Sequence, residues 1–182
     1  MAKIALNSPE QLDKFASPSP NETLKFNSIN LSLPEKFINL LMVDGKKNIA
    51  SQIFSFAAQE FLGVLLEKKT PALKKGQPLL PLYLRKAVRN VQPNLECRRC
   101  RVGGTSHQVP AVVSEKRGQS LAVRWIIESA RKRRKNSGFT ISQCLAQELL
   151  DAYEKQGRPR QRRDQSHKLA SGNRGYLRYR WW

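Results

Sequence analysis

The dipeptide Gly103-Gly104 lies between two runs of alternating side chains, from Leu95 to Val102 and from Thr105 to Val113. Two consecutive glycines can take positive φ at both central positions of a two-residue turn, which is the geometry that joins two right-twisted antiparallel strands. The pattern therefore predicts a β-hairpin at residues 95–113, with Val102 opposite Thr105. Because side chains alternate along a strand, this pairing also fixes which residues share a face.

The predicted hairpin has one cationic face. Counting outward from the turn, Arg101 lies opposite Ser106. Arg99 lies opposite Gln108, and all four side chains point the same way. Guanidinium groups beside amide and hydroxyl groups suit phosphate and ribose, so we expect this face to contact nucleic acid; a merely solvated face is the alternative. The opposite face carries Cys100, Val102, Thr105 and His107.

The chain carries a formal net charge of +19, and almost all of it lies in the second half. Residues 1–84 contain ten Lys or Arg against seven Asp or Glu, whereas residues 85–182 contain 23 against seven, mostly Arg. Arginine offers a planar fork that grips phosphate and stacks on bases, so the bias favours a nucleic-acid partner. A membrane surface is the rival partner. We find neither a basic segment with a wide, aromatic-rich apolar face nor an apolar run of about 18 residues, so no membrane contact is expected.

Helical periodicity surrounds the hairpin, and we expect six helices. They begin at a capping box at residues 32–35, near Lys46, at Pro81, at Gly118, at Thr140 and at about Pro159. The apolar stripe of the second helix is expected to comprise Ile49, Ile53, Phe56, Ala57, Phe61, Val64 and Leu65. The third helix is expected to have Leu84, Ala87, Val88 and Val91 on its apolar face, and the fifth helix Ile141, Leu145, Leu149, Ala152 and Tyr153. Gly157 is expected to close the fifth helix. The predicted fold class is mainly α, a bundle of about six helices with a protruding two-stranded antiparallel β-hairpin arm.

Three parts of the chain differ in composition. Residues 1–31, rich in Ser, Pro and Asn, are expected to be a disordered extension that orders only on a partner. Residues 32–157 are expected to form the helical domain with the arm, interrupted by a loop at residues 68–80. Residues 158–182 are expected to form a basic C-terminal helix followed by an irregular aromatic tail.

Three cysteines, Cys97, Cys100 and Cys144, are an odd number in a chain large enough to need no disulfides, which indicates a reducing compartment. Cys97 and Cys100 together with His107 invite a zinc interpretation. On a strand, however, Cys97 and Cys100 point to opposite faces, so we expect no metal site and no cofactor. The chain has two histidines and neither a carboxylate cluster nor a Gly-rich phosphate loop, so it is not expected to be an enzyme.

Further basic segments accompany the arm. The helix expected at residues 118–135 ends in five consecutive cations, for which phosphate contact is a better explanation than a nuclear-targeting patch or a solvated helix end. The stretch from Tyr176 to Trp182 interleaves aromatic rings with arginines, and suits either stacking on unpaired bases or closing a hydrophobic edge. The residues predicted to contact nucleic acid are Lys46, Lys47, Arg85, Arg89, Arg98, Arg99, Arg101, Lys116, Arg117, Arg124, Arg131, Arg133, Arg134, Arg160, Arg162, Arg163, Lys168, Arg178 and Arg180.

Five segments of the chain resemble small-ribosomal-subunit protein seven of the bacterial and organellar type. They are KFINLLMVDGKKNIA at 36–50, NVQPNLECRRCRVGGTSHQVPAVV at 90–113, SLAVRWIIESARKR at 120–133, LAQELLDAYEKQG at 145–157 and the ending around 173–181. The resemblance implies a helical bundle with an extended hairpin arm that binds the 3′ major (head) domain of small-subunit rRNA. It also implies a role in head assembly, a place near the exit-site tRNA and the mRNA exit path, and small-subunit ribosomal proteins nine and eleven as neighbours.

The resemblance also assigns places to particular residues. It puts Lys46 and Lys47 in a basic turn that meets rRNA, and Arg124 in an Arg-Trp pair of the helix after the arm. Two positions depart from the family pattern, because Cys100 stands where a basic residue is usual and Arg178 where a histidine is usual.

The ending and the long N-terminus favour one compartment. The doubled Trp181-Trp182 and the N-terminal extension favour a ribosome of the mitochondrial matrix, with plastid stroma and bacterial cytoplasm as alternatives. A homo-oligomer is not expected. The alternative function is that of a basic DNA-binding or nucleoid-type protein.

Overall fold

Six α-helices and one two-stranded antiparallel sheet make up the regular structure of residues 32–68 and 79–182, the part of the chain that the computed structural model describes. In chain order these elements are α2 (Leu33–Leu41), α3 (Lys47–Glu67), α4 (Leu79–Val91), β1 (Leu95–Val102), β2 (Thr105–Val112), α5 (Glu115–Asn136), α6 (Ile141–Tyr153) and α7 (Gly157–Gly172), followed by a 3₁₀ helix, η3 (Arg174–Tyr179). The predicted fold class is confirmed. The extension expected at residues 1–31 and most of the loop expected at residues 68–80 lie outside the described residues.

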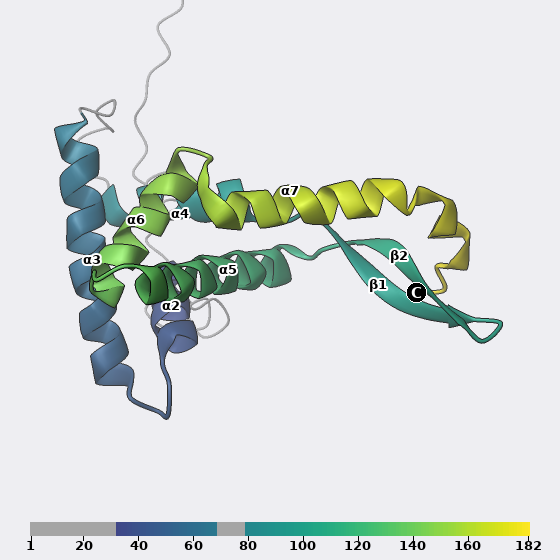
Figure 1. Ribbon diagram of the computed structural model, residues 1–182, viewed down its shortest axis with the longest axis horizontal. Helices are drawn as coiled ribbons and strands as arrows, with labels where there is room; N and C mark the ends of the chain where they lie inside the picture. Colours follow the sequence, from purple (N-terminus) through teal and green to yellow (C-terminus); the bar gives the residue numbers. More distant parts are fainter. Residues whose placement is uncertain (1–31, 69–78) are drawn as a thin grey trace, which may run out of the picture. The chain divides into compact units, whose positions relative to one another are not determined.

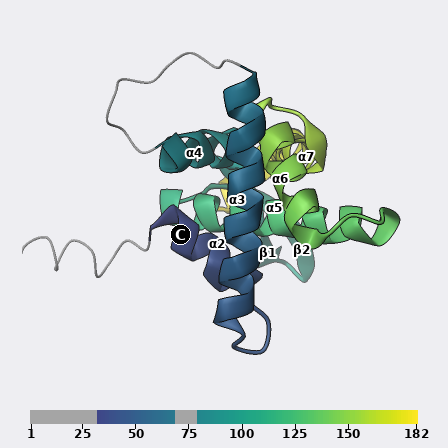
Figure 2. The same cartoon turned by 90° about the vertical axis from the view of Figure 1, so that its left-hand side faces the viewer.

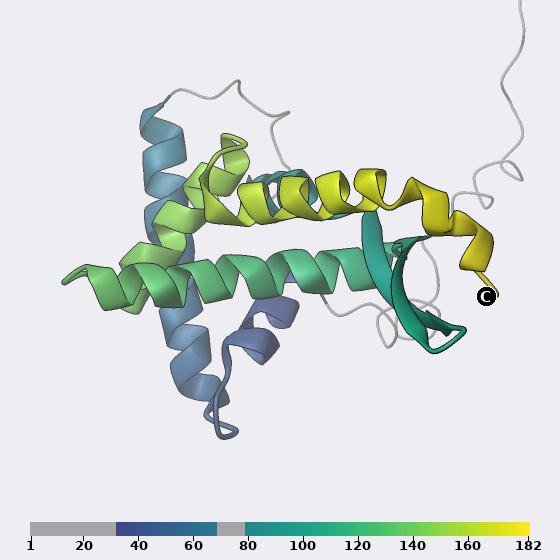
Figure 3. The same cartoon turned by 45° about the vertical axis from the view of Figure 1, so that its right-hand side comes forward.

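Leu33–Trp182 forms one compact unit in which the helices point the hairpin away from the core. Helices α5 and α7 run side by side toward the hairpin, which extends beyond their ends (Figure 1), and the same pairing is visible in Figure 3. Helix α3 crosses the other end of the bundle, as seen end-on in Figure 2. Helix α6 packs against α3, α4 and α5 and so occupies the centre.

The core lies where α6 meets these three helices. Its fully buried large apolar side chains include Phe37, Phe61, Leu65, Leu84, Ile126, Leu145 and Leu149. Burying one such side chain contributes about 1.5–3 kcal/mol relative to leaving it exposed. The apolar face predicted for α4 is confirmed, because Leu84, Ala87, Val88 and Val91 are all buried. The core therefore holds the helices that carry the arm.

The buried stripe predicted for α3 is partly wrong. Ile49 and Phe56 are 53% and 63% exposed. Ala57, Phe61 and Leu65 of the predicted stripe are buried, and the buried face is completed by Ala50, Phe54 and Ala58. Both stripes fit the 3.6-residue period, because this helix has more apolar residues than one face can bury. Helix α3 packs mainly against α6, and the three small alanines on its buried face allow a close approach between helices.

By length and composition alone, α3 is long and apolar enough to cross a membrane, although no membrane contact was predicted from the sequence. The same helix packs against α6 and α2 and buries Phe54, Phe61 and Leu65 in the core. A core helix of a globular domain passes the same test of length and composition, so this feature carries no further conclusion here.

The hairpin has the predicted turn and register. Gly103 and Gly104 have φ values of 57° and 84°, the positive values that the two-residue turn requires. Val102 pairs with Thr105, and the pairing continues without a bulge to Leu95 opposite Val112. The strand parity on which the two faces were predicted is therefore confirmed.

Helix α5 begins three residues before the predicted Gly118. Ser114 is extended and Glu115 occupies the first turn, where an acidic residue complements the helix dipole. Gly118 instead lies inside the helix against the end of α4: a Cβ there would lie 2.9 Å from Nε2 of Gln92 and 3.2 Å from the carbonyl oxygen of Pro93. Glycine at this position lets α5 pass close to the chain that enters β1.

The chain between α6 and α7 also differs from the prediction. Thr140 caps α6 as predicted, and together with Gln143 it forms a capping box. Gly157 does not close α6, because the helix ends at Tyr153 and Lys155 takes the left-handed conformation with φ 63°. Gly157, with φ 86°, is instead the first residue of α7. The tail expected to be irregular is a 3₁₀ helix from Arg174 to Tyr179.

Candidate nucleic-acid interface

The C-terminal segment covers one face of the hairpin. The Sγ atom of Cys100, which is 4% exposed, donates a 3.4 Å hydrogen bond to the carbonyl oxygen of Tyr179. The ring of His107 lies 4.9 Å, centroid to centroid, from the rings of both Tyr176 and Tyr179. We call residues 174–179 the C-terminal strap. The strap covers the Cys100 and His107 part of this face, whereas Val102 and Thr105 next to the turn stay exposed.

The opposite face of the hairpin is open. Arg99, Arg101, Ser106 and Gln108 are all exposed. Their side chains make no hydrogen bond or ion pair with any residue in the described part of the chain. Residues two apart on one face of a strand have Cα atoms about 7 Å apart, so the side chains of Arg99 and Arg101 leave the strand close enough to reach neighbouring phosphates. This face can therefore bind a phosphate backbone without breaking a protein contact.

The two hairpin cysteines contact the C-terminal residues separately. Cys97 accepts a long 3.9 Å contact from Nδ2 of Asn173, while Cys100 bonds to Tyr179. No group of three His, Cys, Asp or Glu residues able to hold a metal occurs among residues 32–68 and 79–182. The positions of these cysteines are explained by packing against the C-terminal residues.

Glu96 ties the base of the arm to α5. Its carboxylate accepts hydrogen bonds from Nε of Arg117 at 2.9 Å and from Nε of Arg98 at 3.1 Å. Burial acts to raise the pKa of Glu96, but the hydrogen bonds from the two arginines outweigh it and the pKa is lowered. Arg98 also lies over the ring of Trp182, at 5.8 Å. Both arginines were predicted to contact nucleic acid, and both are engaged within the protein.

Three arginines of α7 fix that helix to the bundle. Arg160 and Arg163 each donate from Nη1 to the carbonyl oxygen of Asn90, at 2.7 and 2.8 Å. This carbonyl belongs to the last turn of α4, where helix carbonyls have no intrahelical partner and the helix dipole is negative. Arg162 donates to Glu128 and lies 5.3 Å over the ring of Trp125. The positive charge of α7 thus docks it against α4 and α5.

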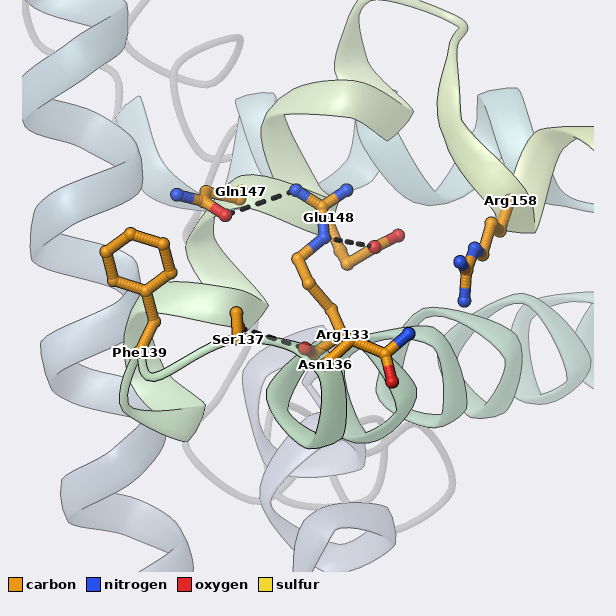
Figure 4. A pocket seen from close by; sticks show the side chains of 7 residues that line it. All are labelled: Arg133, Asn136, Ser137, Phe139, Gln147, Glu148 and Arg158. Atoms are coloured by element: carbon orange, nitrogen blue, oxygen red, sulfur yellow. Dashed lines mark hydrogen bonds and ion pairs between the residues drawn. The ribbon is translucent and has the colours of Figure 1, made fainter.

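Arg133 lies in an ion network between α5 and α6 (Figure 4). It donates to Glu148, Gln147 and Asp151, at 2.8, 3.1 and 2.5 Å. The side chain of Glu148 is 1% exposed, and burial raises its pKa despite the opposing charge of Arg133. The network borders a cavity of about 390 Å³, with Arg158 on its far side. Arg133 was predicted to contact nucleic acid, but in the structure it joins α5 to α6.

The remaining predicted cations keep their charge available. Arg131 is exposed, although one of its nitrogens bonds to the carbonyl oxygen of Leu41 at 3.2 Å. Arg178 and Arg180 lie in and after the strap, with Arg178 bonded to the hydroxyl of Tyr179 and Arg180 to the carbonyl oxygen of Trp182. Of the cations predicted to contact nucleic acid, ten are exposed and make no side-chain hydrogen bond or ion pair with a described residue: Lys46, Lys47, Arg85, Arg89, Arg99, Arg101, Lys116, Arg124, Arg134 and Lys168.

A signal for the ion network was present in the sequence. Glu148 and Asp151 lie on α6 among Leu145, Leu149 and Ala152, which were predicted to face the core. An acidic residue next to a buried stripe needs a cationic partner, because an unpaired buried charge is costly. The identity of that partner depends on how α5 and α6 fold together, so it could not be read from local pattern.

Comparison with known proteins covers almost the whole of this fold. A family described as "Ribosomal protein S7p/S5e" matches residues 11–174. The chain belongs to this family. It is 42% identical over 156 residues to the small ribosomal subunit protein uS7 of Dictyoglomus thermophilum, which covers 86% of this chain and 89% of that protein. It is 33% identical over 206 residues to the small ribosomal subunit protein uS7m of Prototheca wickerhamii, which covers 87% and 93%.

Membership of the S7p/S5e family agrees with the geometry of the candidate interface. The family is one of structural ribosomal proteins rather than enzymes. The relatives include bacterial and mitochondrial proteins, so a ribosomal location is supported without a choice of compartment.

Proposed function

We propose that this protein binds the 3′ major (head) domain of small-subunit rRNA and helps to assemble the head of the subunit. The observation that carries the proposal is the division of its arginines into two groups. The first group forms ion pairs with Glu96, Glu128 and Glu148 or donates hydrogen bonds to backbone carbonyl oxygens, and these arginines hold the fold together. Those on the outer face of the arm and on α4 remain open, and such cations bind a polyanion by releasing its counterions.

The hairpin arm carries part of the proposed interface away from the helical bundle. It extends past the ends of α5 and α7 (Figure 1), and the strap and Glu96 hold it there. An arm fixed in this way can enter a groove or a gap between RNA segments with little loss of conformational entropy on binding. We place it near the exit-site tRNA and the mRNA exit path, with small-subunit ribosomal proteins nine and eleven as neighbours.

The direct test is binding of the full chain to a head-domain fragment of small-subunit rRNA, measured over a range of salt concentrations. The proposal predicts that affinity falls steeply with salt and exceeds the affinity for a random RNA of equal length. Equal affinity for the two RNAs would contradict it. Tighter binding to duplex DNA than to the rRNA fragment would support a DNA-binding protein instead.

Fractionation tests the assembled state. The protein should sediment with small ribosomal subunits through moderate salt, as a bound structural protein does. Cell fractions from organelle and cytoplasm, probed for the same protein, decide between a mitochondrial, plastid or bacterial ribosome. Recovery of the protein away from ribosomal particles would contradict the proposal.

A further inference from the structure

The last two tryptophans have different surroundings. Trp182 is 37% exposed, its ring lies 5.8 Å from the guanidinium of Arg98, and its carbonyl oxygen accepts a 3.3 Å hydrogen bond from Nε of Arg180. Trp181 is 80% exposed, and its ring meets that of Trp182 edge-on, with 5.7 Å between centroids and 84° between planes. Trp182 is therefore engaged with the hairpin, whereas most of the Trp181 ring is open to solvent.

We propose that Trp181 is a stacking platform for an unpaired base of RNA. An indole stacked on a base hides apolar surface that the protein alone leaves in water, and every base offers a face to stack on. The inference rests on the proposed function, because it requires that RNA reach this end of the molecule. It adds a contact that carries no charge to an interface otherwise built from cations.

The other aromatic rings of this segment are already in use. Tyr179 stacks on His107 and Tyr176 packs against it at a tilt, and the ring of Tyr179 also lies 5.0 Å from the guanidinium of Arg178. These contacts close the Cys100 face of the hairpin, one of the two uses predicted for the aromatic tail. The ring of Trp181 takes no part in these contacts and is available for the second predicted use, stacking on an unpaired base.

Charge argues for RNA rather than protein as the occupant. From Gln165 to Trp182 the chain contains no Asp or Glu, and it contains four cations, Lys168, Arg174, Arg178 and Arg180. A nucleic acid supplies a flat ring for the indole and phosphates for the neighbouring guanidinium groups at the same time. Base stacking on aromatic side chains is sequence-tolerant, so the platform would hold an unpaired nucleotide without reading its identity.

The arrangement also limits the cost of binding. The edge-on contact with Trp182 positions the Trp181 ring, and Trp182 is in turn positioned by Arg98. Because Arg98 is fixed by Glu96 at 3.1 Å, the platform is linked to the base of the arm. A ring held before the ligand arrives loses less rotational freedom on stacking.

The test compares Trp181→Leu and Trp181→Phe with the unmodified full chain. Affinities are measured for a short single-stranded oligoadenylate and for an RNA duplex of the same length, each at several salt concentrations. Trp181→Leu should weaken binding to the single strand by about tenfold at every salt concentration, because stacking is not an ionic contact. The slope of log affinity against log salt should stay unchanged, the duplex affinity should stay unchanged, and Trp181→Phe should retain most of the single-strand affinity.

Three outcomes overturn the inference: equal single-strand affinities of the Leu variant and the unmodified protein, an equal loss on the duplex, or a changed salt slope. Because Trp181 is 80% exposed, its replacement should leave the unfolding temperature unchanged, so a folding defect is distinguishable from a lost contact. The proposed function fails on a separate result, the absence of any preference of the unmodified protein for the head-domain fragment.

Discussion

Nε of Arg133 lies 2.8 Å from Oε1 of Glu148, and this pair joins the last turns of α5 to the middle of α6. Removing Arg133 would leave a carboxylate that is 1% exposed without its cation. Breaking a buried pair by removing one partner typically costs about 3–5 kcal/mol. We therefore expect Arg133→Met to lower the free energy of unfolding by about 3 kcal/mol, measured by urea denaturation.

The matched control is Arg134→Met, the same change one residue along the helix. Arg134 is exposed and makes no ion pair with any described residue, so its replacement should change stability by less than about 0.5 kcal/mol. Equal stabilities of the two variants would show that the Arg133–Glu148 pair does not hold α5 to α6.

The strap is expected to order the hairpin. Tyr179→Ala removes the ring that stacks on His107 at 4.9 Å. Amide hydrogen exchange in residues 98–109 should become faster, because the hairpin then loses its cover and opens more often. Leu177→Ala, a change at a half-exposed position of the same 3₁₀ helix, should leave the exchange rates nearly unchanged. Identical protection in Tyr179→Ala and the unmodified protein would exclude this role of the strap.

The anchoring of α7 is expected to depend on pH. Nε2 of His167 accepts a 3.1 Å hydrogen bond from the backbone N–H of Asn94, which only a neutral ring nitrogen can do. Burial lowers the pKa of His167 below its ordinary 6.5, and the charges of Arg163 and Arg160 add to this while Asp164 opposes it. The stabilisation is therefore fully present above pH 6.5 and is lost as pH falls through the folded-state pKa.

Replacing His167 by Gln gives the measurement. The side-chain oxygen of Gln can accept the same hydrogen bond but does not titrate, so the free energy of unfolding of His167→Gln should vary less below pH 6.5 than that of the unmodified protein. Parallel pH profiles for the two proteins would contradict the assignment.

The sequence was sufficient for features that are decided locally. The Gly103-Gly104 turn fixed the hairpin register residue by residue, because two positive φ values and a two-residue period leave one pairing. The helix cap at Thr140 and the apolar face of α4 were likewise decided locally and were predicted correctly.

Features that depend on packing between distant segments were missed. The buried face of α3 was predicted only in part, because packing against α6, and not the helix period alone, selects which of its apolar residues are buried. The structural use of Arg133, Arg160 and Arg163 depends on partners 15 to 73 residues away in the chain. A run of cations looks the same in sequence whether it meets phosphate or a helix carbonyl, so only the fold separates the two uses.

The central claim is that the arm meets RNA with its open face and not with the face under the strap. Arg99 and Arg101 lie on the open face, and Arg98, on the same strand, is held by Glu96 and Trp182. Each phosphate contact contributes about 0.7–0.9 to the slope of log affinity against log salt. The decisive measurement is this slope for a head-domain rRNA fragment with Arg99→Gln, Arg101→Gln and Arg98→Gln. The account predicts a shallower slope for each of the first two and an unchanged slope for Arg98→Gln. A shallower slope for Arg98→Gln, with the other two unchanged, would contradict it.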